Sequence, residues 1–238
     1  MAPLRSILSV AALAAVATAS PVERRAVIGH DEVKPMAGIT PGGITGDVYK
    51  AYQPYLYVAN GCVPFPAVDG YGNTSGGLQD TGSSNGKCSS SEGQIYVRSA
   101  QHGDYFALMY SWYFPKDSPS TGLGHRHDWE GAIVYLKSAT STAADNIAAV
   151  CPSAHGGWTC ATTGYDLSGT RPLLKYESTW PVNHATDLTK TQGGSQPLVA
   201  WEVMPQAAQD ALQSADFGSA IVPFKDSTFT NNLNAATF

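Results

Sequence analysis

The heptapeptide at residues 124–130 gathers groups that could hold a cation or move protons, in a chain of 238 residues. It reads Gly-His-Arg-His-Asp-Trp-Glu, which is two imidazoles, two carboxylates and one guanidinium in a sequence that is only 14% charged. A further carboxylate, Asp117, precedes His125 by eight residues. Groups of these types at such short spacing either hydrogen-bond one another or hold a metal ion.

Two segments around the heptapeptide are candidate strands. Residues 104–114 are rich in aromatic side chains and apolar on both faces, which is typical of a buried strand. The following Pro115 is expected to end this strand, because proline cannot donate to a ladder and favours turns. Residues 127–137 form the second candidate. The sequence therefore allows a hairpin whose connecting loop carries the first residues of the heptapeptide.

Pairing of these strands would bring four side chains together. Strand alternation puts Asp128 and Glu130 on one face, whereas His127 takes the other. The connecting loop would bring Asp117 and His125 to the same end of the hairpin. Three carboxylates and one imidazole then converge on one small volume.

This set of groups favours a hard divalent ion, if it holds an ion at all. Mg²⁺ and Ca²⁺ prefer carboxylates and water, whereas zinc sites usually contain more His or Cys. The spacing matches no known zinc-hydrolase signature. A network of hydrogen-bonded His and Asp that caps the hairpin without an ion is the alternative, and the spacing leaves that choice open.

The N-terminus has the features of an export signal. Residues 1–19 combine an early arginine, an apolar stretch and an Ala-Thr-Ala cleavage site, which is typical of a secretory signal peptide. Residues 20–25 end in two arginines and are interpreted as a possible propeptide, with an ordinary charged tail as the alternative. We expect one domain over residues 26–238, in a secreted, extracellular protein. No segment of the mature protein is long or apolar enough to cross a membrane.

Cysteine usage agrees with export, because an even number in a secreted chain indicates disulfides. The simplest of three possible pairings joins Cys62 to Cys88 and Cys151 to Cys160, since each pair flanks one turn-rich loop. Zinc binding is the competing interpretation, although neither pair has CxxC spacing. Asn73 begins an Asn-Thr-Ser sequon in the first loop and is a candidate for glycosylation.

Charge and composition bound the remaining choices. The net charge is −5, and removing residues 1–25 takes away three arginines and one glutamate, which leaves −7. An acidic chain without a basic block argues against nucleic acid and against simple attachment to anionic lipid. The 24 glycines and 15 prolines favour short strands and turns. We expect a mainly β, single-domain β-sandwich with a few flanking short helices. Further strands are expected at 94–99 and 198–203, and helices at 47–56, 141–150, 205–215 and 226–233.

The chain resembles the necrosis- and ethylene-inducing-like proteins (the NLP family), secreted cytolysins of plant-associated microbes. The heptapeptide stands here unchanged as the family's GHRHDWE motif, and it follows a matching Met-Tyr-Ser-Trp-Tyr-Phe-Pro-Lys-Asp segment at 109–117. Further matches cover nearly all of the mature chain and lie at 62–69, 153–157, 196–201 and 217–224.

The resemblance implies a sandwich similar to those of actinoporin cytolysins and fungal lectins, in a protein that is not an enzyme. It implies binding to the head group of plant glycosyl inositol phosphorylceramide sphingolipids, damage to the host plasma membrane, necrosis and immune responses. A plant immune receptor is expected to recognise the 106–130 segment. The family's divalent cation would be held here by Asp117, His125, Asp128 and Glu130. A loop with an exposed tryptophan and a histidine, matching Trp180 and His184, would contribute to head-group recognition.

Physical reasoning gives the expected cation a role. Bound to carboxylates, it could accept sugar hydroxyls in open coordination positions and offset the repulsion between an acidic protein and an anionic lipid. An exposed Trp180 would suit the membrane interface. Two departures leave alternatives open. The second cysteine pair is not present in simpler members, and some members with an intact heptapeptide are not cytolytic. A non-cytolytic lectin-like binder or immune elicitor and a metal-assisted hydrolase using Glu130 or His125 as base remain the other hypotheses.

Overall fold

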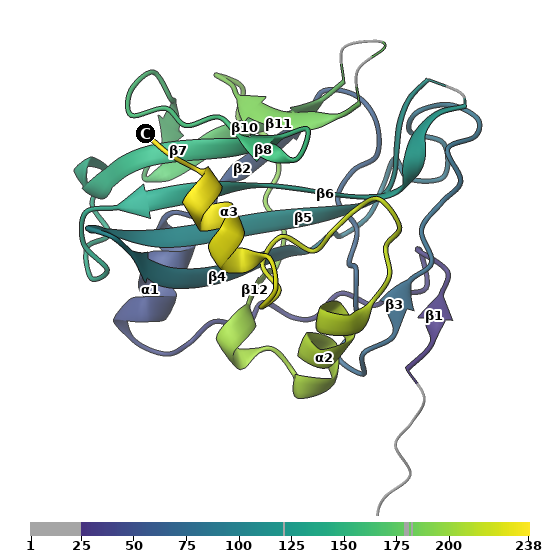
Figure 1. Ribbon diagram of the computed structural model, residues 1–238, viewed down its shortest axis with the longest axis horizontal. Helices are drawn as coiled ribbons and strands as arrows, with labels where there is room; N and C mark the ends of the chain where they lie inside the picture. Colours follow the sequence, from purple (N-terminus) through teal and green to yellow (C-terminus); the bar gives the residue numbers. More distant parts are fainter. Residues whose placement is uncertain (1–24, 121, 179–180, 182) are drawn as a thin grey trace, which may run out of the picture.

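A six-stranded sheet in the order β12-β4-β5-β6-β7-β8 forms the centre of the molecule (Figure 1). The computed structural model describes residues 25–120, 122–178, 181 and 183–238. All neighbouring strands of this sheet are antiparallel except β12 and β4, which are parallel. Its strands are β4 (Ile95–His102), β5 (Tyr105–Ser120), β6 (Leu123–Leu136), β7 (Ile147–Ala154), β8 (Gly157–Trp158) and β12 (Leu198–Ala200).

A smaller sheet packs on one face of the six-stranded sheet, which makes the fold a β-sandwich. It has the order β11-β10-β2, and β9 pairs with the start of β10. The contact between the sheets includes stacked rings of Phe114 and Tyr176, whose centroids are 3.8 Å apart. The strands of the small sheet are β2 (Tyr55–Val58), β9 (Leu167–Ser168), β10 (Arg171–Glu177) and β11 (Ala185–Leu188), and a separate parallel pair joins β1 (Val27–Ile28) to β3 (Thr74–Ser75).

The C-terminal segment covers the other face. Figure 1 shows α3 (Phe229–Ala235) lying across the large sheet. The buried hydroxyl of Tyr135 donates to the carbonyl of Leu233 at 3.0 Å, which ties β6 to this helix. The remaining helices, α1 (Ile44–Ala51) and α2 (Gln206–Ser214), lie beside the sheet rather than within the sandwich. Both faces of the central strands are therefore buried, as their continuous apolar sequences predict.

The β5–β6 hairpin is confirmed, but the prediction that Pro115 ends the first strand is wrong. The strand β5 continues to Ser120, because a β-bulge absorbs the irregularity: Lys116 lies opposite both Arg126 and His127. The Lys116 side chain is buried, and its ammonium donates to the carbonyls of Thr81 and Ser83 at 3.0 and 2.8 Å. These two hydrogen bonds satisfy the buried ammonium and attach the loop that contains Thr81 and Ser83 to β5.

Other predictions are corrected in part. The helix expected at 141–150 is wrong: a short 3₁₀ turn at Ala144–Asn146 leads directly into β7, because the apolar residues after it are needed as a strand beside β6. The helix expected at 47–56 is α1, which ends before Pro54, and the residues after that proline form β2. The helix expected at 226–233 is α3, which begins after its N-cap residue Thr228, and Asp226 before it pairs with Arg98 at 2.8 Å.

The strands expected at 94–99 and 198–203 correspond to β4 and to β12, the latter followed by a 3₁₀ turn, and the helix at 205–215 corresponds to α2. Both expected disulfides are present, Cys62–Cys88 and Cys151–Cys160. Among the helices of the described residues, none has the length and apolarity to span a bilayer.

Candidate metal centre

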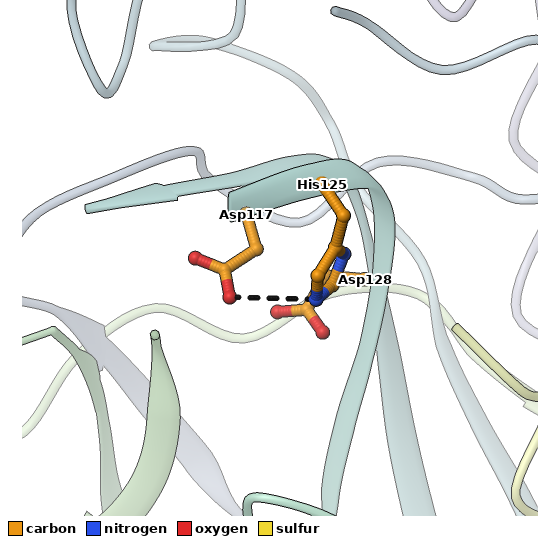
Figure 2. A group of neighbouring side chains, drawn as sticks. All are labelled: Asp117, His125 and Asp128. Atoms are coloured by element: carbon orange, nitrogen blue, oxygen red, sulfur yellow. Dashed lines mark ion pairs between the residues drawn. The ribbon is translucent and has the colours of Figure 1, made fainter. Parts of the chain in front are cut away.

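The β5–β6 hairpin brings Asp117, His125 and Asp128 together, as Figure 2 shows. One ligand atom from each of the three lies within 4.8 Å of the others. Asp117 and His125 are cross-strand partners, and His125 Nε2 lies 3.8 Å from Asp117 Oδ2. His125 Nδ1 donates to the carbonyl of His127 at 2.7 Å, because a carbonyl can only accept. This bond leaves Nε2 as the atom that faces the carboxylates.

The bulge explains why these three side chains meet. His125 and Asp128 are three residues apart, so strict alternation would put them on opposite faces of β6. Two residues of β6, Arg126 and His127, occupy the place opposite Lys116, and His127 has a positive φ of 61°. The pairs Phe114–Asp128 and Asp117–His125 flank the bulge, so each strand has two residues within it and neither strand has a net extra residue. The irregular backbone at His127 breaks the alternation and brings both site residues to the same side.

Gly124 permits the close approach of the two strands at this point. Its φ is +114°, and a Cβ placed on it would lie 2.1 Å from the carbonyl oxygen of Asp117. No other residue fits this contact without moving the backbone beside a site carboxylate. The glycine that opens the heptapeptide is therefore part of how the site is built.

Glu130 lies outside the group of three but on the same strand face as Asp128. The hydroxyl of Ser153 donates to Glu130 Oε2. The three carboxylic side chains are almost fully buried, with 1% of Asp117, 6% of Asp128 and 7% of Glu130 exposed. The structure therefore groups two carboxylates and one imidazole, and the third predicted carboxylate, Glu130, lies beside them in contact with Ser153 of the neighbouring strand β7.

The carboxylates of this cluster are buried and repel one another, and both effects disfavour their charged forms. Burial, together with the charge of Asp117, raises the pKa of Asp128 to about 7. Burial raises the pKa of Glu130 well above its usual value, and the neighbouring Asp128 adds to that effect. A cation among these groups would favour the charged carboxylates and so oppose both shifts. Two carboxylates and one imidazole are ligands that divalent ions accept, so the residues fit such an ion.

Two ring side chains contact the carboxylates from the side of the small sheet: Tyr176 of β10 and His184, which directly precedes β11. The Tyr176 hydroxyl donates to Asp128 Oδ2 at 2.7 Å. The His184 imidazole and its backbone N–H both donate to Asp117 Oδ1, at 2.6 and 3.2 Å. His184 is 2% exposed, and within the described part of the chain its Nε2 has no hydrogen-bond partner. The structure therefore places His184 against a site carboxylate, a contact that the sequence did not predict.

The carboxylates line a cavity of about 430 Å³, which is within the size range of small-molecule sites. One wall is the β7–β8 hairpin, whose central residues His155 and Gly156 both have positive φ, as two-residue hairpin turns require. The Cys151–Cys160 disulfide closes the base of this hairpin. The C-terminal segment supplies another wall, and the lining includes His155, Trp158, Asn183, Ser219, Ile221 and Asn232.

Sequence reasoning missed these walls, because their residues carry no charge pattern and come from distant parts of the chain. Trp112 and Trp129 are core aromatics, 0% and 8% exposed, and Trp129 also lines the cavity. Trp180 lies outside the described residues. The Asn73 side chain donates to Asp69 Oδ2 at 2.8 Å and accepts from the backbone N–H of Ala26, so its amide is engaged within its loop.

The sequence profile described as "Necrosis inducing protein (NPP1)" matches residues 46–236. The chain belongs to this necrosis-inducing protein family. Among its relatives, NLP effector protein 10 of Phytophthora capsici is 48% identical over 231 residues, which cover 95% of this chain and 97% of the relative. Necrosis-inducing protein NPP1 of Phytophthora nicotianae is 42% identical over the same length and coverage.

Solved structures of the NPP1 family share this fold. The structure described as "Toxin fold as basis for microbial attack and plant defense" is 46% identical, with a TM-score of 0.85 over 90% of this chain and 100% of that one. NLPPya in complex with mannosamine gives a TM-score of 0.84 at the same identity and coverage. The non-toxic HaNLP3 protein gives 0.82 at 38% identity, over 87% of this chain and 98% of that one. The fold thus occurs in proteins described as toxins and in one described as non-toxic.

Proposed function

We propose that this protein is a secreted cytolysin that binds the head group of plant glycosyl inositol phosphorylceramides with the help of a divalent cation, Mg²⁺ or Ca²⁺. The observation that carries the proposal is the buried cluster of Asp117, Asp128 and Glu130, whose uncompensated charge lies on the wall of an open cavity. Stable folds seldom keep three carboxylates this close without a ligand or a proton to separate them. Damage to the host plasma membrane, with necrosis and immune responses, would follow from binding.

The residues of the cavity fit a sugar-bearing ligand. Asp117, His125 and Asp128 would hold the cation, with Glu130 adding negative charge beside them. When bound, a divalent cation supplies open coordination positions for hydroxyl oxygens and positive charge toward a phosphate. The Asn232 and Asn183 side chains place amide groups along the remaining lining. Similar proteins in solved structures are described as complexes with mannosamine and glucosamine, which supports a glycan ligand.

The further parts of the proposal concern residues other than the cation ligands. Trp180 and His184 would contribute to head-group recognition, Trp180 at the membrane interface and His184 at the cavity wall. Residues 1–19 would be removed as a signal peptide and residues 20–25 as a propeptide, which leaves the domain at 26–238. Glycosylation of Asn73 and recognition of the 106–130 segment by a plant immune receptor stay as predictions.

We propose a binding protein rather than an enzyme. Glu130, the candidate base of a hydrolase, is engaged by Ser153, and His125 uses Nδ1 to bond a backbone carbonyl. Turnover of chromogenic glycosides or phosphodiesters that disappears in Glu130→Gln would support hydrolysis instead.

A non-cytolytic binder or immune elicitor with the same fold is the second candidate. The observation that favours it is the match to HaNLP3, which is described as non-toxic and aligns over 87% of this chain. Fold and heptapeptide therefore support binding more directly than they support killing.

Dye release from vesicles tests the proposal. We expect release from phosphatidylcholine vesicles that contain plant glycosyl inositol phosphorylceramide, and none from phosphatidylcholine alone. Chelation should abolish release, and excess Mg²⁺ or Ca²⁺ should restore it. Binding to the glycolipid vesicles without release would favour the elicitor, whereas release unaffected by chelator would contradict the cation-dependent mechanism.

A further inference from the structure

We propose that Tyr176 is the positioning residue of the cation site, which aims Asp128 through its hydroxyl and Asp117 through the stacked ring of His184. This inference rests on the proposed cation site. Tyr176 lies on β10 of the small sheet, whereas both carboxylates belong to the β5–β6 hairpin of the large sheet. The small sheet would thereby be a working part of the cation site rather than only a cover for the core.

The hydroxyl fixes one oxygen of Asp128. Tyr176 is fully buried, and its hydroxyl donates to Asp128 Oδ2 at 2.7 Å. Because a carboxylate oxygen can only accept, the tyrosine hydroxyl is the donor in this bond. This hydrogen bond occupies Oδ2 from the side of the small sheet and orients the Asp128 carboxylate. Oδ1 is then the oxygen available to an ion. Such outer hydrogen bonds commonly orient metal ligands.

The ring fixes the group that holds Asp117. The Tyr176 ring lies between Phe114, at 3.8 Å and 6° between planes, and the His184 imidazole, at 4.7 Å and 15°. His184 in turn gives Asp117 Oδ1 two hydrogen bonds, from Nδ1 and from its backbone N–H. On the edge of the imidazole, a Cβ placed on Gly61 would lie only 2.3 Å from Nε2. The stack and Gly61 therefore leave the imidazole little freedom to turn.

The arrangement serves both carboxylates from one side chain. A simple core tyrosine would need one acceptor for its hydroxyl and apolar neighbours for its ring, as Tyr110 has with the carbonyl of Tyr49. Tyr176 instead donates its hydroxyl to Asp128 and stacks its ring on His184, which in turn donates to Asp117. Loss of its hydroxyl should thus change the binding of an ion that Tyr176 itself does not touch.

Tyr176→Phe separates the hydroxyl from the ring, because it keeps the stack and removes only the bond to Asp128. We expect the dissociation constant for Ca²⁺ or Mg²⁺ alone, measured by titration calorimetry on the full mature chain, to rise about 10-fold to 100-fold. The rise in melting temperature that saturating ion gives the wild type should shrink in parallel. Tyr110→Phe is the matched control, since it also removes one buried hydroxyl and one hydrogen bond, and it should leave ion affinity unchanged.

The outcomes distinguish this inference from the cation site itself. Wild-type protein that binds neither ion would overturn both. Wild-type protein that binds an ion, with Tyr176→Phe binding it equally well, would overturn the positioning role alone. If Tyr176→Phe does not fold, Phe114→Leu gives a second measurement, because it loosens the stack and removes no hydrogen bond to a carboxylate. Ion affinity equal to wild type in Phe114→Leu would then overturn the inference, whereas an affinity weakened by at least several-fold supports it.

Discussion

At the residue scale, Asp128 shows how a carboxylate can be kept buried for a purpose. It is 6% exposed, it faces Asp117, and its pKa is raised to about 7. The cost of that burial is compensated only in part by the Tyr176 hydroxyl. A position optimised for stability alone would not keep this charge, so the residue is better explained by the cation that we propose it holds.

Asp128→Asn tests that explanation. The amide oxygen can still accept from Tyr176, while the negative charge is removed, so the ion-free protein should unfold at the same temperature or a higher one. Ion binding and vesicle leakage should both fall at least about 10-fold. Asp166→Asn makes the same charge change at an exposed position outside the cavity and should have no effect on either. Full leakage by Asp128→Asn would show that the carboxylate is not needed.

Gly124 is a second single residue on which the site depends, because only a hydrogen side chain lets β5 and β6 approach this closely. Gly124→Ala should destabilise the fold by about 2–4 kcal/mol in urea denaturation, from a positive φ together with the clash on the Asp117 carbonyl. Gly122→Ala is the control, since it has φ +78° but nothing within 4 Å of its Cβ, and it should cost only about 1 kcal/mol. Equal costs for the two variants would mean that the close contact is unimportant.

At the element scale, the β5–β6 hairpin was predictable and its bulge was not. Aromatic and apolar runs on either side of the heptapeptide indicate two paired strands, and the pairing brings the acidic residues together. The irregular pairing at Arg126 and His127 lies opposite Lys116, whose buried ammonium contacts a distant loop, and no local pattern reveals either feature. The helix expected at 141–150 was wrong for a similar reason. The pairing of β7 with β6 outweighs the weak helical pattern of these residues, and the local sequence does not reveal that pairing.

The β7–β8 hairpin is the element that shapes the cavity wall. Removing its disulfide with Cys151→Ala and Cys160→Ala should lower the free energy of unfolding by about 2–3 kcal/mol. Because Ser153, His155 and Trp158 lie between or beside these cysteines, affinity for the glycolipid head group should also fall. Calorimetry with the ion alone serves as the control measurement and should change by less than about 2-fold, since the three grouped ligands come from the other hairpin. Equal losses of affinity for the ion and for the head group would indicate that removing the disulfide perturbs the whole fold.

At the scale of the whole molecule, the proposed function requires an acidic protein to approach an anionic lipid. The chain has a net charge of −5, and the described residues include no helix suited to cross a bilayer. The sandwich class and its single domain were predictable from composition and motifs, because short strands and many turns leave few other architectures. The cavity was not, since β7–β8 and the C-terminal segment meet there only after folding.

Screening and bridging by a cation can be told apart in a sedimentation experiment. Binding to glycolipid vesicles in chelator should stay low when NaCl is raised from about 0.01 to about 0.15 M, although screening lengths fall to about 8 Å. A millimolar divalent salt should restore binding at either ionic strength, because it fills a defined site. Sodium chloride that restores binding as well as Ca²⁺ would point to general charge repulsion rather than to a site.

A crystal structure of the protein over residues 26–238, grown in Ca²⁺, would show whether the carboxylate cluster holds an ion. We expect one ion in contact with Asp117 and Asp128 at about 2.3–2.6 Å, with water completing its coordination toward the cavity. Clear density that shows the same carboxylates bonded only to Tyr176 and His184, with no ion between them, would contradict the account.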